Sequence, residues 1–170
     1  MRYFTKEMWA GWQEEASRFD ESHVKRRAAA YWRQFAKLEP RLGKGTAKFL
    51  RTASLHDARL LTMTTRDLNA GGPKLPKRYP TVIELFLQPM NRSYPKYHLR
   101  YSSVRRVCFD FPSDRPLFHS EAGGLDDWGY DEITAADRQF LRHEVIFSSG
   151  AELLIEFTKL SCRNVKSFAC

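Results

Sequence analysis

Hydrophobic residues recur at spacings of three and four over most of the first third of the chain. The spacing runs from Thr5 to Phe19 and again from Ser22 to Leu38, where Pro40 interrupts it. Because this period matches one face of an α-helix, it predicts two amphipathic helices. The first is expected to be capped by Thr5 and the second to end at Pro40.

After a short third helix, expected over residues 46–53, the period changes to the alternation typical of β-strands. We expect strands over residues 55–65, 81–88, 97–109, 143–147 and 152–157. The 81–88 segment is apolar on both faces, which predicts a central place in a sheet. The 97–109 segment is expected to bulge at Ser102-Ser103. Residues 69–80, rich in proline and glycine, predict a loop.

The clearest signal is a β-hairpin near the C-terminus. Ser148-Ser149-Gly150 joins two runs of β-branched and aromatic residues, and a glycine-containing connection of this length predicts a turn between paired strands. The alternation within the two strands predicts that they bury Val145, Phe147, Leu153 and Ile155.

Two further segments precede the hairpin. We expect an acidic loop over residues 126–132 and a short helix over residues 134–141, where Thr134 and Asp137 have the spacing of a capping box. Helices first and strands afterwards predict an α+β fold, with an N-terminal helical hairpin and a short third helix packed on a mostly antiparallel sheet of about five strands. We expect a single domain over residues 1–170, with a helical part (1–54), a sheet part (55–158) and a tail (159–170).

The charge of the chain is polarised. Its formal net charge is +8, but residues 25–51 hold nine cations against one acid (+8) and residues 109–144 hold nine acids against three cations (−6). Such a chain pairs its two charged parts internally or presents a signed surface to a partner. The three cysteines match no metal spacing, and no signal peptide or membrane span is evident, so we expect free thiols in a cytoplasmic protein.

Three short motifs resemble those of one family. They are Tyr3-Phe4-Thr5-Lys6-Glu7, Leu55-His56-Asp57-Ala58, and the Trp128-x-Tyr130-x-Glu132 segment ahead of His143-Glu144 and Ser149-Gly150. The chain resembles a family of uncharacterised bacterial proteins, a domain of unknown function. Its His-Asp segment before the strands is also similar to small bacterial immunity proteins. The resemblance implies a bacterial cytosolic protein and no particular reaction.

Nine residues are candidates for binding a partner or a ligand: His56, Asp57, Asp127, Trp128, Tyr130, Asp131, Glu132, His143 and Glu144. We expect most of them to converge on one end of the sheet, where the 55–65 and 143–147 strands begin. Tryptophan and tyrosine are enriched at interface hot spots, and the carboxylates would attract a basic partner. The alternative is that the aromatic rings pack inward. The sequence favours a non-enzymatic protein-binding module, immunity-like in character, that uses this acidic aromatic loop.

Nonspecific nucleic-acid binding is the first alternative. Seven cations of the helical part could form a ridge that contacts a phosphate backbone: Lys25, Arg26, Arg33, Lys37, Lys44, Lys48 and Arg51. The same face could instead be solvated, or could cradle the acidic 109–144 segment. The loose connection before the third helix does not match a helix-turn-helix.

A metal-dependent enzyme is the second alternative. If His56 and His143 faced one pocket, two imidazoles and a carboxylate could bind a metal ion. Adjacent strand residues point to opposite faces, so at most one member of each His-acid pair can join such a site. Otherwise one imidazole is a buried hydrogen-bonding residue and the other lies at the surface. The sequence has no nucleophile turn or phosphate-binding loop, and we assign no catalytic residue, metal ligand or cofactor.

Overall fold

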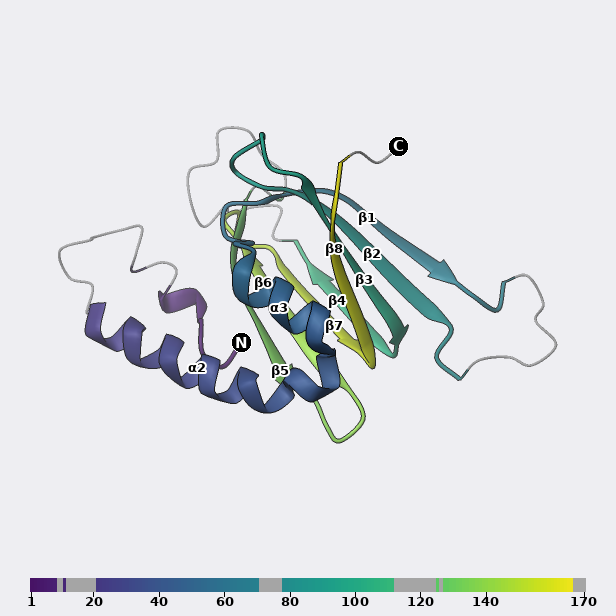
Figure 1. Ribbon diagram of the computed structural model, residues 1–170, viewed down its shortest axis with the longest axis horizontal. Coiled ribbons are helices and arrows are strands. Elements are labelled where there is room, and N and C mark those ends of the chain that lie inside the picture. Colours follow the sequence, from purple (N-terminus) through teal and green to yellow (C-terminus); the bar gives the residue numbers. More distant parts are fainter. Residues whose placement is uncertain (9–10, 12–20, 71–77, 112–124, 126, 167–170) are drawn as a thin grey trace.

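The computed structural model describes residues 1–8, 11, 21–70, 78–111, 125 and 127–166. Two helices, α2 (Glu21–Leu42) and α3 (Lys44–Thr52), lie beside a set of antiparallel strands (Figure 1). The strands are β1 (Arg59–Asp67), β2 (Thr81–Gln88), β3 (Lys96–Val104), β4 (Arg106–Asp110), β5 (Trp128–Ala135), β6 (Leu141–Phe147), β7 (Glu152–Phe157) and β8 (Lys159–Val165).

The strands form two four-stranded sheets, in the orders β1-β2-β3-β8 and β4-β7-β6-β5. Two strand pairs pass from one sheet to the other, because only Arg105 separates β3 from β4 and only Thr158 separates β7 from β8. Backbone hydrogen bonds continue across the bend, from Arg105 N to Glu156 O at 3.0 Å and from Thr158 N to Ser102 O at 3.3 Å. The two sheets are therefore joined at this corner by strands that pass directly from one to the other.

The bend has a local cause in β3. Ser103 has a φ of +52°, and the β2–β3 register skips it, since Thr81 pairs with Val104 and Val82 with Ser102. An extra residue in one strand increases its bend and twist. The bulge expected at Ser102-Ser103 is confirmed, and it is the point at which the chain changes sheets.

The core lies on the inner faces of the two sheets. Alternate residues of β2, β3, β6 and β7 are almost fully buried, among them Leu85, Leu99, Val145 and Ile155. The helices pack beside them, α3 against β8 and α2 against β5 (Figure 1). Thr46 ties α3 to the sheet, because its hydroxyl donates to the Leu160 carbonyl at 3.0 Å.

Much of the predicted secondary structure is confirmed. The fold is α+β with antiparallel sheets, and β2 has the predicted bounds and lies between two neighbours. β6 and β7 form the predicted hairpin, and Val145, Phe147, Leu153 and Ile155 are at most 2% exposed. The predicted number of strands and sheets is wrong, since the chain bends into two sheets instead of one.

Four predicted boundaries are wrong. The strand expected over residues 97–109 is divided at Arg105 into β3 and β4, which belong to different sheets. α2 continues through Pro40 to Leu42, because a proline in the last turn removes only one hydrogen bond while Leu42 gains a buried place. The first strand begins at Arg59, since residues 55–58 form a turn. The expected tail is also ordered in part, because residues 159–165 are β8 and complete the first sheet.

The region before the hairpin also differs from the prediction. The expected loop is largely β5, and no helix forms over residues 134–141, where a tight connection joins β5 to β6. Asp137 does not act in a capping box. Its carboxylate accepts hydrogen bonds from the backbone of Gln139 and Phe140, both at 2.7 Å, which stabilises a turn. The first predicted helix, and the loop over residues 69–80, lie partly outside the described residues.

Candidate functional site

The Leu55–Ala58 segment is a turn attached to the first residue of β5. Asp57 has a φ of +62°, and Ala58 N donates to Leu55 O at 3.0 Å. Asp57 N donates to Trp128 O, and Trp128 N donates to Ala58 O, both at 2.8 Å. The Leu-His-Asp-Ala motif therefore holds the start of β5, and it places His56 and Asp57 beside Trp128.

A chain of four side chains lies on the inner face of β5. Trp128 Nε1 donates to Asp131 Oδ1 at 2.9 Å, and the other carboxylate oxygen lies 3.0 Å from His143 Nε2. On the far side of the imidazole, Nδ1 lies 2.7 Å from the Tyr101 hydroxyl. Trp128, His143 and Tyr101 are buried, so Asp131 alone of the four reaches solvent, with 21% of its side chain exposed.

Burial determines whether Tyr101 and the neighbouring thiol in this row of side chains are protonated. Desolvation raises the pKa of Tyr101 well above its ordinary value, so the phenol keeps its proton, and its hydroxyl lies within hydrogen-bond distance of His143 Nδ1. On the other side of the imidazole, Nε2 is within hydrogen-bond distance of Asp131 Oδ2. Cys162 lies nearby, and burial together with the charge of Asp131 raises its pKa to about 12. These groups are engaged or protonated at neutral pH, and none is an activated nucleophile.

The outer face of β5 holds the N-terminal segment. The buried carboxylate of Glu132 accepts hydrogen bonds from three successive backbone N–H groups, those of Arg2, Tyr3 (2.7 Å) and Phe4 (3.2 Å). Arg27 of α2 closes the arrangement by donating to the carbonyls of Arg2 and Tyr3. Glu132 is therefore an anchor for the N-terminal segment and is not accessible to a partner.

The neighbouring groups extend this anchor. Glu144 Oε1 lies 3.1 Å from the amino nitrogen of Met1. Thr5 Oγ1 accepts a hydrogen bond from Met8 N at 3.4 Å, in agreement with its predicted capping role. The Tyr3–Glu7 motif thus marks a segment that is strapped over β5 and then begins a helix.

A cavity of about 240 Å³ opens where this strap, α2 and the His56 turn meet; we call it the aromatic pocket. Its walls are the rings of Phe4, Tyr31, Trp32 and Tyr130, with His56 at one side and Asp131 also in its lining. The rings support one another, since Phe4 stacks on Tyr130 at 5.4 Å and meets Tyr31 edge-on at 5.3 Å. The His56 ring lies edge-on to Tyr130 at 5.5 Å.

The backbone of β5 adds polar groups to the aromatic pocket. Ile133 N donates to the Tyr31 hydroxyl at 3.2 Å, on the side of the strand that faces away from β6. Alternate residues of a strand direct their peptide groups to the same side, so the N–H and C=O of Asp131 also face away from β6. The pocket therefore combines aromatic walls, a carboxylate and the edge of a strand.

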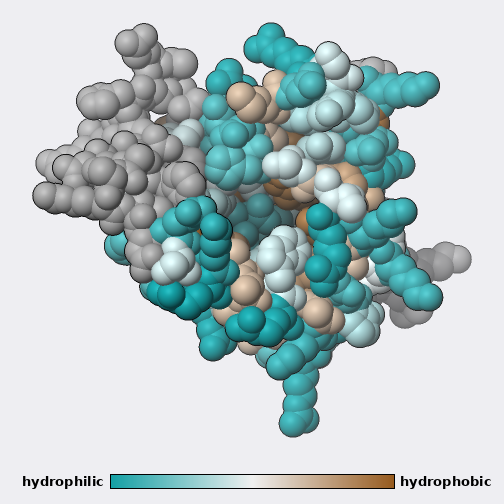
Figure 2. All heavy atoms as spheres, turned by 60° about the vertical axis from the view of Figure 1, so that its left-hand side comes forward, coloured by the Kyte–Doolittle hydropathy of each residue, from teal (hydrophilic) through white to brown (hydrophobic). Residues whose placement is uncertain are grey.

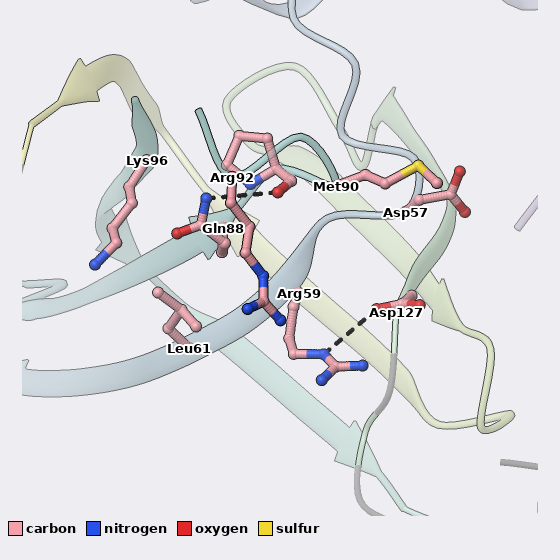
Figure 3. Close-up of a pocket in the computed structure, with 9 residues that line it drawn as sticks. Asp57, Arg59, Leu61, Gln88, Met90, Arg92, Lys96 and Asp127 are labelled. Carbon is pink, nitrogen blue, oxygen red and sulfur yellow. Dashed lines mark hydrogen bonds and ion pairs between the residues drawn. The ribbon is translucent and has the colours of Figure 1, made fainter. Parts of the chain in front are cut away.

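A second cavity, of about 380 Å³, lies on the other side of the His56 turn and is mainly polar; we call it the charged pocket. Figure 3 shows the guanidinium groups of Arg59 and Arg92 directed toward the same space, with Asp57 and Met90 at its rim. Arg59 Nε lies 3.4 Å from Asp127 Oδ1. Asp127 thus serves to pair with a strand arginine.

The structure brings most of the predicted site residues together, but on two faces of β5. Trp128, Asp131 and His143 lie on the inner face, and Tyr130 lies on the outer face beside His56. Trp128, Glu132 and His143 are at most 1% exposed, so the expected display of an acidic aromatic loop is wrong for these residues. The order of residues along a strand decides which ones reach the surface.

The aromatic pocket also uses residues that the sequence did not single out. Phe4 belongs to the N-terminal motif, and Tyr31 belongs to the apolar face of α2, so both were expected only to pack or cap. Trp32 offers a usable signal, because it is a large ring that follows Tyr31 off the apolar stripe of the helix, and it is 37% exposed.

The predicted basic ridge is exposed. Its seven cations occupy exposed positions of α2 and α3: Lys25, Arg26, Arg33, Lys37, Lys44, Lys48 and Arg51. Some of them have partners: Lys25 Nζ lies 2.8 Å from Glu21, Arg26 donates to Ser22 Oγ at 2.9 Å, and Arg51 pairs with Glu39. Figure 2 shows this side of the molecule, where hydrophilic side chains surround smaller apolar areas.

The two histidines of the predicted metal site do not share a ligand set. His143 has both ring nitrogens within hydrogen-bond distance of protein groups, and His56 Nδ1 lies 2.8 Å from Asp57 Oδ2. Among the described residues, no three His, Cys, Asp or Glu side chains gather as a metal site. In the same part of the chain no helix is both long enough and apolar enough to cross a membrane. No protein-family model, curated protein or solved structure matches this chain.

Proposed function

We propose that this chain is a non-enzymatic binding module that accepts a basic side chain of a partner protein in the aromatic pocket. One observation carries the proposal: the carboxylate of Asp131 is held by Trp128 and His143, and Asp131 lines the same pocket as the rings of Tyr31 and Tyr130. A lysine or arginine entering this space would meet both a fixed negative charge and aromatic faces.

Both the aromatic rings and the carboxylate of the pocket favour a cationic ligand over a neutral one. A cation over an aromatic ring gains attraction from the ring quadrupole, and the gain grows as water is excluded. Within the described residues, one hydrogen-bond contact is seen at each oxygen of Asp131, and a carboxylate oxygen has lone pairs for a further donor. Hydrogen bonds between charged groups are roughly twice as strong as neutral ones. The volume of about 240 Å³ suits one long side chain.

The chemistry of the pocket supports binding rather than catalysis. Tyr101, His143 and Cys162 lie behind Asp131, in a buried chain of hydrogen bonds or as a protonated thiol, and are kept from a ligand in the pocket. His56 lines the pocket and has its Nδ1 2.8 Å from Asp57 Oδ2, but no activated nucleophile lies beside it among the residues that line the pocket. A group that serves as a base must reach the substrate.

The test is a titration with three short peptides that differ only in a central lysine, arginine or glutamine, followed through the Trp32 indole by nuclear magnetic resonance. We expect the two basic peptides to bind and the glutamine peptide not to bind. Asp131→Asn is expected to weaken binding about tenfold or more, because it removes the charge and keeps the shape. Asp127→Asn, in the charged pocket, is the matched control and is expected to leave affinity unchanged.

A second variant guards against a folding artefact, since Asp131 also supports a buried network. Tyr130→Ala removes one wall of the aromatic pocket from its outer side and is expected to weaken binding of the same peptides without altering His143. Equal binding of the glutamine peptide, or wild-type affinity in both variants, would contradict the proposal.

Nonspecific nucleic-acid binding is a second candidate, favoured by the exposure of all seven cations on one pair of helices. Binding of a labelled 20-base duplex is expected to fall steeply between about 50 and 200 mM salt, because phosphate contacts release counterions. Arg33→Glu with Lys37→Glu should weaken it, while Arg78→Glu with Arg92→Glu, an equal change of charge at exposed residues of the loops on either side of β2, should weaken it less. If both double variants lost the same amount of duplex binding, the effect would come from net charge alone.

A further inference from the structure

Strand β4 is an exposed edge of the second sheet. It pairs with β7 on one side, and within the described residues no strand pairs with its other side. All five of its residues, Arg106–Asp110, are exposed. An edge strand with unpaired N–H and C=O groups is a template for pairing with another chain, and β4 has no proline to prevent it.

The apolar side chains of β4 continue the buried face of its sheet. Val107 pairs with Ile155 and Phe109 pairs with Leu153 across the ladder, so each lies on the same face as its partner. Ile155 and Leu153 are 1% exposed, whereas Val107 is 42% and Phe109 45% exposed. Among the residues that the structure describes, the inner face of the sheet thus runs past the last strand and leaves these two side chains partly exposed.

The hydrogen-bond pattern shows which peptide groups point outward. In the β6–β7 hairpin Phe147 N donates to Ala151 O, so by alternation the odd-numbered residues of β7 bond to β6 and the even-numbered ones face β4. Cys108 pairs with the even-numbered Leu154 and therefore directs its peptide groups at β7. Val107 and Phe109 direct theirs at the open edge.

The sequence of β4, Arg-Val-Cys-Phe-Asp, is complementary to itself when reversed. In an antiparallel pair centred on Cys108, Arg106 of each copy lies opposite Asp110 of the other. Val107 then lies opposite Phe109 of the second copy, and the outward N–H and C=O groups of both residues meet. Opposite charges and apolar pairs directly across two strands each stabilise the pairing.

We propose that two copies of this chain associate through β4, which joins their second sheets into one continuous antiparallel sheet across a twofold axis. The interface is isologous, as the commonest dimers are. Val107, Phe109 and their counterparts cover one another on the inner face, and two Arg106–Asp110 pairs lie on the outer face. The two Cys108 residues form a pair without backbone hydrogen bonds, for which the Cα separation is about 4.5 Å.

The test measures the mass of the full chain by sedimentation equilibrium between about 5 and 200 µM. We expect a monomer–dimer equilibrium. Each of the single variants Arg106→Asp and Asp110→Arg places two pairs of like charges across the dimer interface. Each is expected to raise the dissociation constant about tenfold. The double variant restores two opposite-charge pairs in reversed order and is expected to recover the wild-type constant, which a general loss of folding could not do.

Cross-linking supplies an independent readout of the register. In a variant with Cys162→Ser and Cys170→Ser, mild oxidation is expected to join the two copies through Cys108, since about 4.5 Å between Cα atoms lies within the range of disulfides. Adding Asp110→Arg to this variant should suppress the cross-link. A chain that stays monomeric at 200 µM, or a dimer whose constant ignores the charge reversals, would overturn the proposal.

Discussion

The reactivity of a single side chain in this protein depends on how deeply it is buried, as two cysteines show. Cys162 lies near Tyr101 and Asp131, where burial and then the carboxylate charge raise the pKa of its thiol to about 12. Cys108 is exposed on the edge strand β4. Two thiols of one chain therefore differ in reactivity because the thiolate, and not the thiol, is the reacting form.

We expect Cys162 to resist labelling in the native protein. At pH 8 a thiol with a pKa of about 12 is ionised in about one molecule in ten thousand, so a Cys108→Ser, Cys170→Ser variant should react very slowly with a thiol reagent. The same variant in 8 M urea should react at the rate of a free cysteine. Native labelling as fast as that of a variant that keeps only Cys108 would contradict the burial of Cys162.

At the scale of elements, the N-terminal segment is held by a side chain far along the sequence. The three backbone N–H groups of residues 2–4 converge on the carboxylate of Glu132, which is 0% exposed. An acceptor that serves three donors has no close substitute. The segment carries Phe4 into the aromatic pocket, so the anchor also shapes the candidate site.

Glu132→Gln is expected to destabilise the protein by about 1–3 kcal/mol, because the amide turns an N–H donor toward backbone N–H groups that need an acceptor. Urea unfolding measures the change, and hydrogen exchange should show loss of protection at residues 2–4. Glu152→Gln, in a half-exposed ion pair with Lys6, is the matched control and should change stability little. A Glu132 variant as stable as that control would mean that the segment is held by its aromatic rings.

The same elements show what the sequence could predict. Periodicity located α2 and β2, and turn chemistry located the β6–β7 hairpin, because these signals are local. Local sequence patterns failed to predict β5, because its acidic residues suggested a loop. Asp131 and Glu132 are acceptable in a buried strand only because Trp128, His143 and the backbone of residues 2–4 supply their donors. Those donors lie elsewhere in the sequence, so no local pattern could reveal them.

At the scale of the whole molecule, ion pairs on the two sheets make stability depend on pH. On the first sheet, His98 Nε2 lies 3.1 Å from Glu84, and Arg163 Nε donates to His98 Nδ1 at 3.0 Å. A neutral imidazole with its proton on Nε2 satisfies both contacts. Burial, followed by the charge of Arg163, lowers the pKa of His98 below its ordinary value.

One carboxylate on each sheet also has a pKa below its ordinary value. Partial burial alone would raise the pKa of Glu84, but Arg66 and Arg100 outweigh it and hold the pKa below its ordinary value. On the second sheet burial likewise opposes, and the hydrogen bonds from Arg105 and Arg142 lower the pKa of Glu156. All three groups are thus deprotonated more readily in the folded chain than in the unfolded one.

The sign of the effect follows from linkage. A group whose pKa is lower in the folded state binds fewer protons there, so its contribution to stability is present above the unfolded pKa and is lost as the pH falls through the folded pKa. We expect the urea midpoint to decline in two stages, the first below about pH 6.5 from His98 and the second below about pH 4.3 from Glu84 and Glu156.

Two histidine variants separate the stages. His98→Gln should remove the first stage and leave the second, because it deletes the titrating imidazole but none of the carboxylates. His23→Gln, an exposed position on α2, is the matched control and should keep both stages. The measurement is the urea midpoint of the three proteins from pH 8 to pH 3. A wild-type urea midpoint that rises as the pH falls from 7 to 5 would contradict this prediction. It would show that His98 gains a proton more readily in the folded protein, so that its contact with Glu84 outweighs burial and the charge of Arg163.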